Sequence, residues 1–100
     1  MKKRFIVCIS DFTKDKDVKF IEFIRNNRLG WWHWLPNTWL LSDPNGKLSV
    51  KQIRDQVRQI YDNEHVLVIE INNVGDTWSG FGPSSEQKNM FKWIKNNWKK

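Results

Sequence analysis

The order of two kinds of apolar pattern constrains the fold of this chain more than any other feature of its sequence. Residues 5–9 are an uninterrupted apolar run rich in β-branched side chains, which is typical of a strand buried on both faces. After a polar loop, apolar residues recur at helical spacing and predict a helix. The apolar positions of this helix are Val18, Ile21 and Ile24, widened by Phe20 and Phe23. Residues 26–30 end the helix, and Gly30 is the expected left-handed stop.

The middle of the chain predicts a hairpin and then a second helix. Residues 31–35 and 38–42 form the two strands of the hairpin, because tryptophan favours strands and Pro36-Asn37 supplies a turn between them. Ser49 and Gln52 have the spacing of a capping box, which marks the start of the helix. The apolar side of this helix consists of Val50, Ile53, Val57 and Ile60.

The apolar run 65–71 predicts a last strand and completes the order strand–helix–strand–strand–helix–strand. This is the split βαβ pattern of a ferredoxin-like α+β fold, a two-layer sandwich with an antiparallel sheet. In that fold the first and third strands are central, which suits the uninterrupted run at 5–9. We expect residues 4–72 to form this core, within one domain that covers 1–100.

The remaining residues, 73–100, predict an addition to the core. A loop rich in Trp and Gly comes first, and a C-terminal helix follows, with Ser84 or Ser85 as its N-cap. The apolar side of that helix is expected at Met90, Phe91, Ile94 and Trp98.

Four of the seven tryptophans lie between positions 31 and 39. Because side chains alternate between the faces of a strand, this hairpin is apolar on both faces, whereas the two predicted helices cover only one. The C-terminal helix with Trp93 and Trp98, a second subunit or nucleic-acid bases could cover the other. No Lys or Arg lies between 31 and 41, which favours an interface over a base-stacking surface. The expected interface residues, in a homodimer, are Trp31, Trp32, Trp34 and Trp39.

The charge of the chain favours a polyanionic partner. Its formal net charge is +6 and its pI is about 9.7, as is common for proteins that bind nucleic acid. A lone cysteine, Cys8, fits a reducing compartment, and no segment has the roughly 20 apolar residues that cross a bilayer. We therefore expect a cytoplasmic protein without membrane association. The expected phosphate contacts are Lys14, Lys16, Arg28, Lys47, Lys51, Arg54 and Arg58.

Asp11 is the first candidate for chemistry. It follows a predicted central strand, where a carboxylate can be held at the rim of the sheet and can share a Mg²⁺ ion with phosphates and water. The alternative is that Asp11 is a turn or helix-cap residue. The only histidines are His33 and His65, and we expect both to be structural.

Several segments together resemble known families. They are Ile9-Ser10-Asp11, Trp31 to Leu35, Thr38 to Leu40, Ser49 to Asp55, and Val66 to Glu70 followed by Trp78-Ser79-Gly80-Phe81. Over residues 4–82 the chain resembles small bacterial and phage proteins described as SinR-like. It resembles more distantly the CRISPR-associated adaptation nucleases and the VapD ribonucleases. This resemblance implies a homodimer and, in some members, a magnesium-dependent phosphodiesterase in which Asp11 is catalytic and binds the metal. Those nucleases usually have Tyr where this chain has Ser10.

Two functions follow from this sequence. The first is a homodimer that binds nucleic acid and cleaves it as a Mg²⁺-dependent endoribonuclease or endodeoxyribonuclease with Asp11. The second is a protein-interaction module without catalysis, such as a phage, plasmid, toxin–antitoxin or defence factor, that docks through the Trp-rich hairpin. Binding that falls steeply with salt distinguishes the first from the second, because phosphate contacts release counterions.

Overall fold

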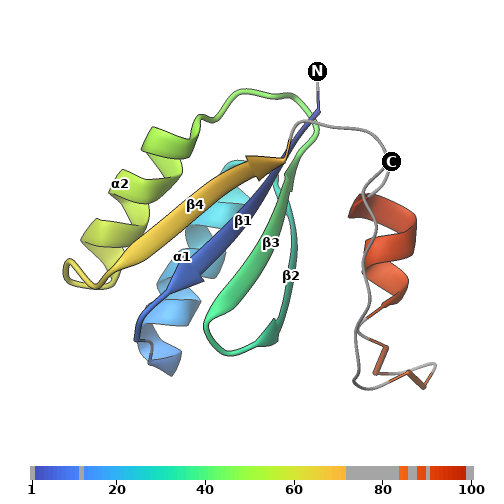
Figure 1. Cartoon of the computed structure of the whole chain (residues 1–100), viewed down its shortest axis with the longest axis horizontal. Helices are drawn as coiled ribbons and strands as arrows, with labels where there is room; N and C mark the ends of the chain where they lie inside the picture. Colours follow the sequence, from blue (N-terminus) through green and yellow to red (C-terminus); the bar gives the residue numbers. More distant parts are fainter. Residues whose placement is uncertain (1, 12, 72–83, 86–87, 90, 99–100) are drawn as a thin grey trace.

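The computed structural model of the chain describes residues 2–11, 13–71, 84–85, 88–89 and 91–98 (Figure 1). The elements are β1 (Lys3–Ile9), α1 (Lys14–Asn26), β2 (Gly30–Leu35), β3 (Thr38–Asp43), α2 (Val50–Ile60), β4 (Val66–Ile71) and a short π-helical turn, η1 (Ile94–Trp98). The predicted Trp- and Gly-rich loop falls on 72–83 and lies outside the described residues.

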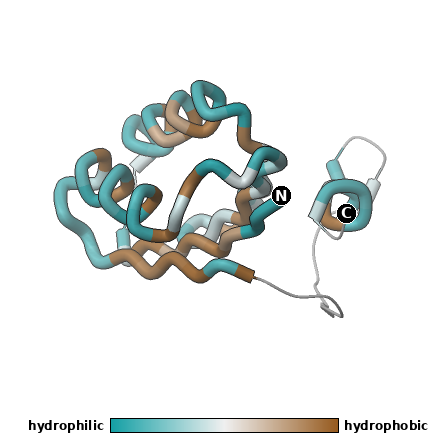
Figure 2. Tube along the Cα trace, turned by 90° about the horizontal axis from the view of Figure 1, so that it is seen from above, coloured by the Kyte–Doolittle hydropathy of each residue, from teal (hydrophilic) through white to brown (hydrophobic). Residues whose placement is uncertain are grey.

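Four strands form one antiparallel sheet in the order β2-β3-β1-β4. Strands β1 and β3 are therefore central, as the sequence predicts for a ferredoxin-like arrangement. Figure 2 shows both helices over one face of the sheet. The predicted α+β sandwich with an antiparallel sheet is thus confirmed.

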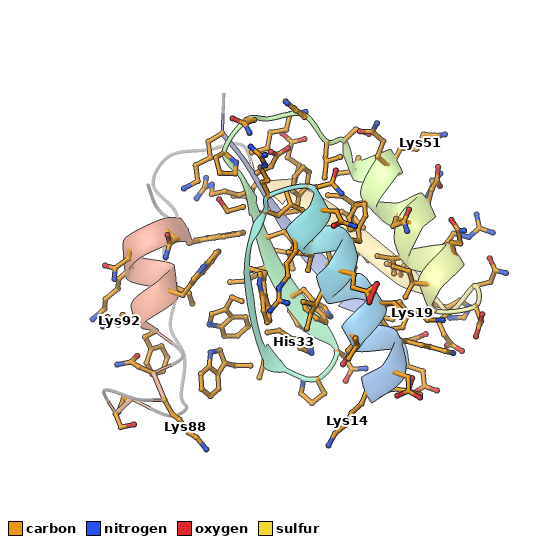
Figure 3. All side chains as sticks on the ribbon, turned by 180° about the vertical axis from the view of Figure 1, so that it is seen from behind. Lys14, Lys19, His33, Lys51, Lys88 and Lys92 are labelled. Carbon is orange, nitrogen blue, oxygen red and sulfur yellow. The ribbon has the colours of Figure 1, made fainter. Side chains whose placement is uncertain are left out.

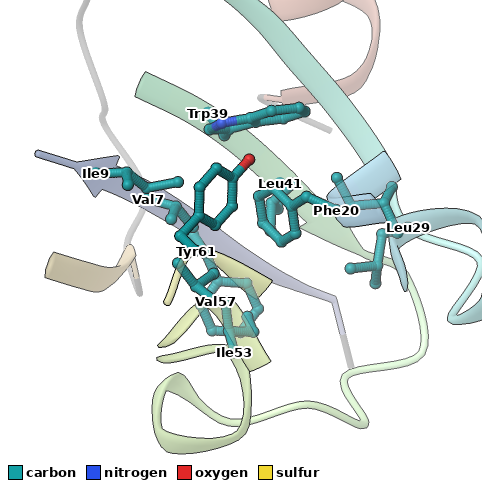
Figure 4. Packing of buried hydrophobic residues seen from close by; sticks show 11 residues of the cluster. Val7, Ile9, Phe20, Leu29, Trp39, Leu41, Ile53, Val57 and Tyr61 are labelled. Atoms are coloured by element: carbon teal, nitrogen blue, oxygen red, sulfur yellow. The ribbon is translucent and has the colours of Figure 1, made fainter. Parts of the chain in front are cut away.

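The main core lies between the helices and the sheet. Every second residue of β1, from Phe5 to Ile9, is buried there together with two residues of β3, Trp39 and Leu41. The helices and the residue after α2 contribute Phe20, Ile24, Ile53, Val57 and Tyr61. Figure 4 shows Trp39 above Phe20 and Tyr61. The alternation of buried and half-buried residues along β1 reflects the two faces of a strand.

Helix α1 differs from the prediction in its buried side and in its end. Thr13 is the N-cap, and Phe20 and Ile24 are the buried residues, whereas Val18 is 56% exposed. Asn27 is the C-cap, and the left-handed residue after it is Arg28, with φ 56°, in place of the predicted Gly30. The predicted stripe begins too early because both Phe20 and Val18 fit a helical period, and only packing against β3 selects between them.

Gly30 has a different role as the first residue of β2. A Cβ atom at this position would lie 3.2 Å from the ring of Trp93 and 3.5 Å from Cβ of Ser42. The absence of a side chain therefore lets Trp93, from the C-terminal segment, lie directly against β2.

The start of α2 agrees with the prediction. Ser49 Oγ accepts from the backbone N–H of Gln52 at 3.1 Å, and Gln52 Oε1 accepts from the N–H of Ser49 at 2.9 Å, which completes the capping box. The preceding turn is closed by Asp43, a buried carboxylate that accepts from the N–H groups of Asn45 and Leu48. These hydrogen bonds satisfy a charge that would otherwise be costly to bury.

A second apolar cluster lies on the sheet face opposite the helices. Trp32, Ile94 and Trp98 are its buried members. Half-buried residues packed against them are Ile6, Leu40, Ile71, Phe91 and Trp93. The C-terminal segment, which we define as described residues 84–98, therefore covers part of this face.

Ser85 Oγ accepts from the N–H of Lys88 at 3.1 Å, but neither Ser85 nor Ser84 caps the helical turn that leads into η1. Ser84 pairs with Asn89 in an isolated antiparallel bridge. Asn89 Oδ1 instead accepts from the N–H groups of Phe91, at 2.9 Å, and Lys92, at 3.1 Å. A side-chain oxygen that accepts from the first free N–H groups is the usual device of an N-cap, so Asn89 has the role expected of Ser84 or Ser85. Met90 lies outside the described residues.

Candidate nucleic-acid interface

The four hairpin tryptophans occupy different environments. Trp39 is wholly buried in the helix-side core, with the ring of Phe20 edge-on at 4.7 Å, and Trp32 is buried on the opposite face. Trp31 is half-buried against Trp39, whereas Trp34 is 40% exposed. Trp39 therefore belongs to the core of the chain and not to an intermolecular surface. Of these four residues, only Trp34 has the exposed side chain that is expected of an interface residue.

A cavity of about 400 Å³ lies where β2 meets the C-terminal segment. Its lining residues are Trp31, Trp32, His33, Trp34 and Trp93. We call this the indole cavity. It involves both faces of β2, which is an edge strand whose pairing with β3 is irregular between Trp32 and Leu35. The sequence named the C-terminal helix with Trp93 and Trp98 as one possible cover of the hairpin, and these residues do pack with Trp32, but it did not predict a cavity between them.

His33 is fixed within a polar network that the sequence did not predict. Its ring stacks on Trp39 at 3.6 Å with an interplanar angle of 5°. Nδ1 lies 3.1 Å from the carbonyl oxygen of Thr38, to which it donates, and Nε2 lies 3.5 Å from Oδ2 of Asp17. The hydroxyl of Tyr61 donates to Oδ1 of Asp17 at 2.6 Å. Burial first, and then the Asp17 carboxylate, raises the pKa of Tyr61 far above its usual value.

The C-terminal segment presents several exposed lysines. Lys88, Lys92 and Lys95 are all exposed, and the described residues of this segment contain no Asp or Glu. Figure 3 shows Lys88 and Lys92 on the outer side of this segment, which lies next to the strand that carries His33. The sequence from 84 to 98 has three lysines and one acid, Glu86, and an excess of positive charge attracts phosphate groups.

The N-terminal basic residues hold the C-terminal segment in place. Lys2 Nζ donates to the carbonyl oxygen of Asn97. The Arg4 guanidinium lies 5.4 Å from the ring centroid of Trp98 and donates to the Trp98 carbonyl oxygen at 3.5 Å. Desolvation, and then the charge of Arg4, lowers the pKa of Lys2. These two residues therefore have a structural role that their place in a basic run, Lys2 to Arg4, did not reveal.

The predicted phosphate contacts are spread over the helix layer and its loops. Figure 3 places Lys14 and Lys51 at opposite ends of that layer. Both Lys51 and Arg54 contact the Asp55 carboxylate, at 3.4 and 2.9 Å, and Arg58 donates to the Asn63 side chain at 3.2 Å. The neighbouring cations, Arg54 first, lower the pKa of Asp55, so this acid offsets part of the positive charge of α2.

Three further residues of the predicted phosphate contacts, Lys16, Arg28 and Lys47, have different surroundings. Lys16 Nζ forms an ion pair with Asp62 at 2.9 Å. A hydrogen bond to Asp62 is the main reason that the pKa of Lys16 is raised, with smaller effects from Glu64 and Asp11. Arg28 and Lys47 are exposed residues in the loops after α1 and β3. The structure does not gather the predicted set into one patch.

Asp11 is exposed and lies two residues after the end of β1, beyond Ser10. The end of the strand is well held, because Asn37 Nδ2 donates to the Ile9 carbonyl oxygen at 2.9 Å, and Ser10 Oγ bonds Glu64 and the His65 N–H. Among the described residues, no group of three or more His, Cys, Asp or Glu side chains could hold a metal ion. Two nearby acids already have partners, since Asp62 bonds Lys16 and Glu64 bonds Ser10.

On the sheet face opposite the helices, two large apolar side chains of β4 are exposed in the part of the chain that the structure describes. Leu67 and Ile69 are 58% and 42% exposed. They pair across the ladder with Cys8 and Ile6 of β1. A surface depression of about 300 Å³ adjoins Leu67 at the end of β1. Exposed leucine and isoleucine on neighbouring positions of one face are typical of a contact surface.

Comparisons with protein-family models, with curated proteins and with solved structures found no match for this chain. The resemblance to SinR-like proteins and to the two nuclease families stays a prediction. In the part of the chain that the structure describes, no helix combines the length and the apolar character needed to cross a bilayer.

Proposed function

We propose that this protein is a cytoplasmic homodimer that binds the phosphate backbone of nucleic acid. The observation that carries the proposal is the C-terminal segment, where Lys88, Lys92 and Lys95 are exposed and the sequence has one acid, Glu86, against these three lysines. The formal net charge of +6 supports it further. Lys14, Arg28 and Lys47 extend the positive surface, whereas Lys16, Lys51 and Arg54 contribute less because carboxylates contact them.

Equilibrium binding to labelled single-stranded and double-stranded DNA and RNA tests this proposal, measured from about 50 to 200 mM salt. Phosphate contacts release counterions, so we expect the logarithm of the affinity to fall linearly with the logarithm of the salt concentration. Affinity for none of these nucleic acids at low salt would refute the proposal.

Catalysis at Asp11 is the enzymatic form of the same proposal. Its support is an exposed carboxylate at the rigidly held end of a central strand. Mg²⁺ needs few protein ligands, because it keeps several waters and binds substrate phosphates. The other donors would have to come from those groups or from a second copy of the chain. Metal-dependent cleavage that is lost in Asp11→Asn, with the fold intact, would support this form, whereas equal cleavage by the variant would make Asp11 a turn residue.

A protein-interaction module is the second candidate. Its support is the exposed apolar pair Leu67 and Ile69, together with Trp34 and Leu35 at the tip of the hairpin, which are also exposed. The exposed apolar pair on β4 marks the surface that we assign to the homodimer contact, in place of the buried tryptophans. Binding to a protein that is insensitive to salt, with no binding to nucleic acid, would favour this second function.

A further inference from the structure

We infer that two copies of this chain join edge to edge, through antiparallel pairing of β4 with β4 of the second copy. The inference rests on the homodimer of the proposed function, and it specifies the surface, the geometry and the charges that hold the two copies together. It gives a role to Glu70, which does not belong to the predicted set of site residues.

Strand β4 is an edge strand without the features that usually keep such an edge from pairing. Its six residues, Val66 to Ile71, pair with six consecutive residues of β1 and form one edge of the sheet. The strand contains no Pro and no Lys, and five of its six residues are apolar. An edge strand also presents backbone N–H and C=O groups that can bond a further strand. The opposite edge strand, β2, is irregular between Trp32 and Leu35, so β4 is the edge better suited to pairing.

The exposed apolar residues of β4 select one register of this pairing. In an antiparallel ladder, residues directly opposite each other share a face of the sheet. Leu67 and Ile69 alternate with Val66 and Val68, which pack on the helix-side core, so both exposed residues lie on the other face. With Val68 on a two-fold axis, Leu67 of each copy lies opposite Ile69 of the other. This register therefore places the two exposed apolar residues against each other.

The charged residues beside this edge are not fully paired within one chain. Figure 1 shows α2 beside β4, and Lys51 and Arg54 of α2 line a surface depression of about 240 Å³ together with Val66. Both cations contact the same carboxylate, Asp55, and Lys51 does so at the longer distance of 3.4 Å. Glu70, on the helix side of β4, forms no hydrogen bond or ion pair with another residue that the structure describes. Two cations thus share one acid, and a second acid on the same edge has no partner.

The register centred on Val68 also brings these opposite charges together. Glu70 of each copy lies opposite Val66 of the other, at the depression that Lys51 lines. Lys51, Arg54, Asp55 and Glu70 carry two charges of each sign, so the surface that they form is neutral. Two chains that each have a net charge of +6 repel each other, and a neutral, self-complementary surface is where they can meet. Charge complementarity therefore selects a second copy of this chain as the occupant of the edge.

Pairing of identical edges also closes the assembly at two copies. A two-fold axis through Val68 joins the two sheets into one continuous sheet, with the helices of both copies on the same face. Each copy uses its own β4 edge, so a third copy finds no free β4 edge.

Sedimentation equilibrium of the wild type and of charge variants tests the inference. Glu70→Lys places a cation beside Lys51 in both halves of the interface, so the dimer dissociation constant should rise about 2- to 30-fold, the effect of losing two surface ion pairs. Adding Lys51→Glu to Glu70→Lys restores opposite charges and should recover most of the dimer affinity. Glu22→Lys makes the same charge change on an exposed position of α1, and should leave the dissociation constant nearly unchanged.

Hydrogen exchange measured by mass spectrometry keeps the test decisive where a variant alters the fold. In the wild type, amides of residues 66–71 should exchange more slowly above the dimer dissociation constant than below it, because a second β4 supplies new acceptors for their N–H groups. Packing of the two sheets face to face would instead bury Leu67 and Ile69 without new backbone hydrogen bonds.

Two outcomes would overturn the inference, and they differ in what else they overturn. A dimer that is unaffected by Glu70→Lys, with exchange of the β4 amides independent of concentration, would refute edge pairing and leave the homodimer standing. A wild type that is monomeric at micromolar concentration would refute both edge pairing and the homodimer. The binding of nucleic acid is tested independently by its dependence on salt.

Discussion

The two faces of the sheet use tryptophan in opposite ways. On the helix face, Trp39 is wholly buried among Phe20, His33 and Trp31. On the other face and at the edge, Trp34 remains 40% exposed beside a cavity. Both residues belong to the same hairpin and differ only in strand and in position. Residue type therefore did not decide the role of these indoles. The cover at each position did, since Trp32, on the same strand as Trp34, is buried against Ile94 and Trp98.

The two faces of the sheet also differ in their polar groups. The helix face contains a hydrogen-bonded network through His33, Asp17 and Tyr61. The indole N–H of Trp39 is an exception, since it has no hydrogen-bond partner among the described residues. Such a buried donor costs about 1–3 kcal/mol, and the close ring packing around Trp39 offsets this cost. The main core is on the helix face, and the C-terminal segment covers part of the opposite face with a second apolar cluster.

The largest expected effect comes from Trp39→Ala. This variant should lower the free energy of unfolding by about 3–5 kcal/mol, because it leaves a large cavity in a close-packed core. Urea unfolding followed by circular dichroism measures the change. The matched variant Trp34→Ala should change stability by less than about 1 kcal/mol. Equal losses from the two variants would contradict the division between the faces.

The variant Trp39→Phe tests whether the aromatic ring of Trp39, and not its N–H, stabilises the core. It keeps an aromatic ring and removes the unpartnered N–H, so its loss of stability should be well below that of Trp39→Ala. A loss as large as that of the alanine variant would show that the indole N–H has a partner in solution.

Tyr61→Phe should have the next largest effect, about 1.5–3 kcal/mol, because it removes a hydrogen bond to the Asp17 carboxylate. The pKa of Tyr61 is raised in the folded state, so its contribution is fully present below the pKa of an unfolded tyrosine, about 10. It should decline as the pH rises above that value, because only the unfolded chain then ionises.

The free energies of unfolding of the wild type and of Tyr61→Phe, measured at pH 8 and pH 10.5, separate the effect of the hydrogen bond from the effect of tyrosine ionisation. The difference between the two proteins should be smaller at the higher pH. A difference that stays constant would mean that Tyr61 ionises equally in both states.

The sequence predicted the order and the type of the elements because each depends on local pattern. The run at 5–9 and the capping box of Ser49 and Gln52 are local signals, and both agree with the structure. The left-handed residue Arg28 and the cap at Asn89 did not follow from such signals. At both sites the residue preferred by statistics lies nearby, and tertiary packing selected another.

The candidate site could be predicted only in part for the same reason. Trp31 to Trp34 mark the hairpin side of the indole cavity, but the other side comes from Trp93, about 60 positions further along the chain. Asp17 and Tyr61 likewise meet His33 through packing alone. The spacing of apolar residues along the sequence does not predict which atoms of such distant segments come into contact.

Leu67→Glu tests the exposed apolar pair of β4 with a small effect on stability, because Leu67 is 58% exposed. If β4 forms the homodimer contact, the charge should dissociate the dimer. Sedimentation equilibrium at micromolar concentration should then give a mass near 12.1 kDa for the variant and about twice that for the wild type. A wild type that is already monomeric would refute the homodimer, and a variant that stays dimeric would place the contact elsewhere.

The smallest expected effect distinguishes the lysines of the C-terminal segment from the cations of α2. Lys92→Gln combined with Lys95→Gln removes two exposed charges from a segment with three lysines and one acid, Glu86. For single-stranded nucleic acid each lost phosphate contact should reduce the slope of log affinity against log salt by about 0.7, so the double variant should reduce it by about 1.4. Lys51→Gln combined with Arg54→Gln removes the same formal charge, but both cations already contact Asp55, so the slope should change less. Affinity should fall about equally for every sequence in either case, since phosphate contacts carry no base information. A larger change of this slope for the α2 variant would show that the phosphate contacts lie on the helix layer and not on the C-terminal segment.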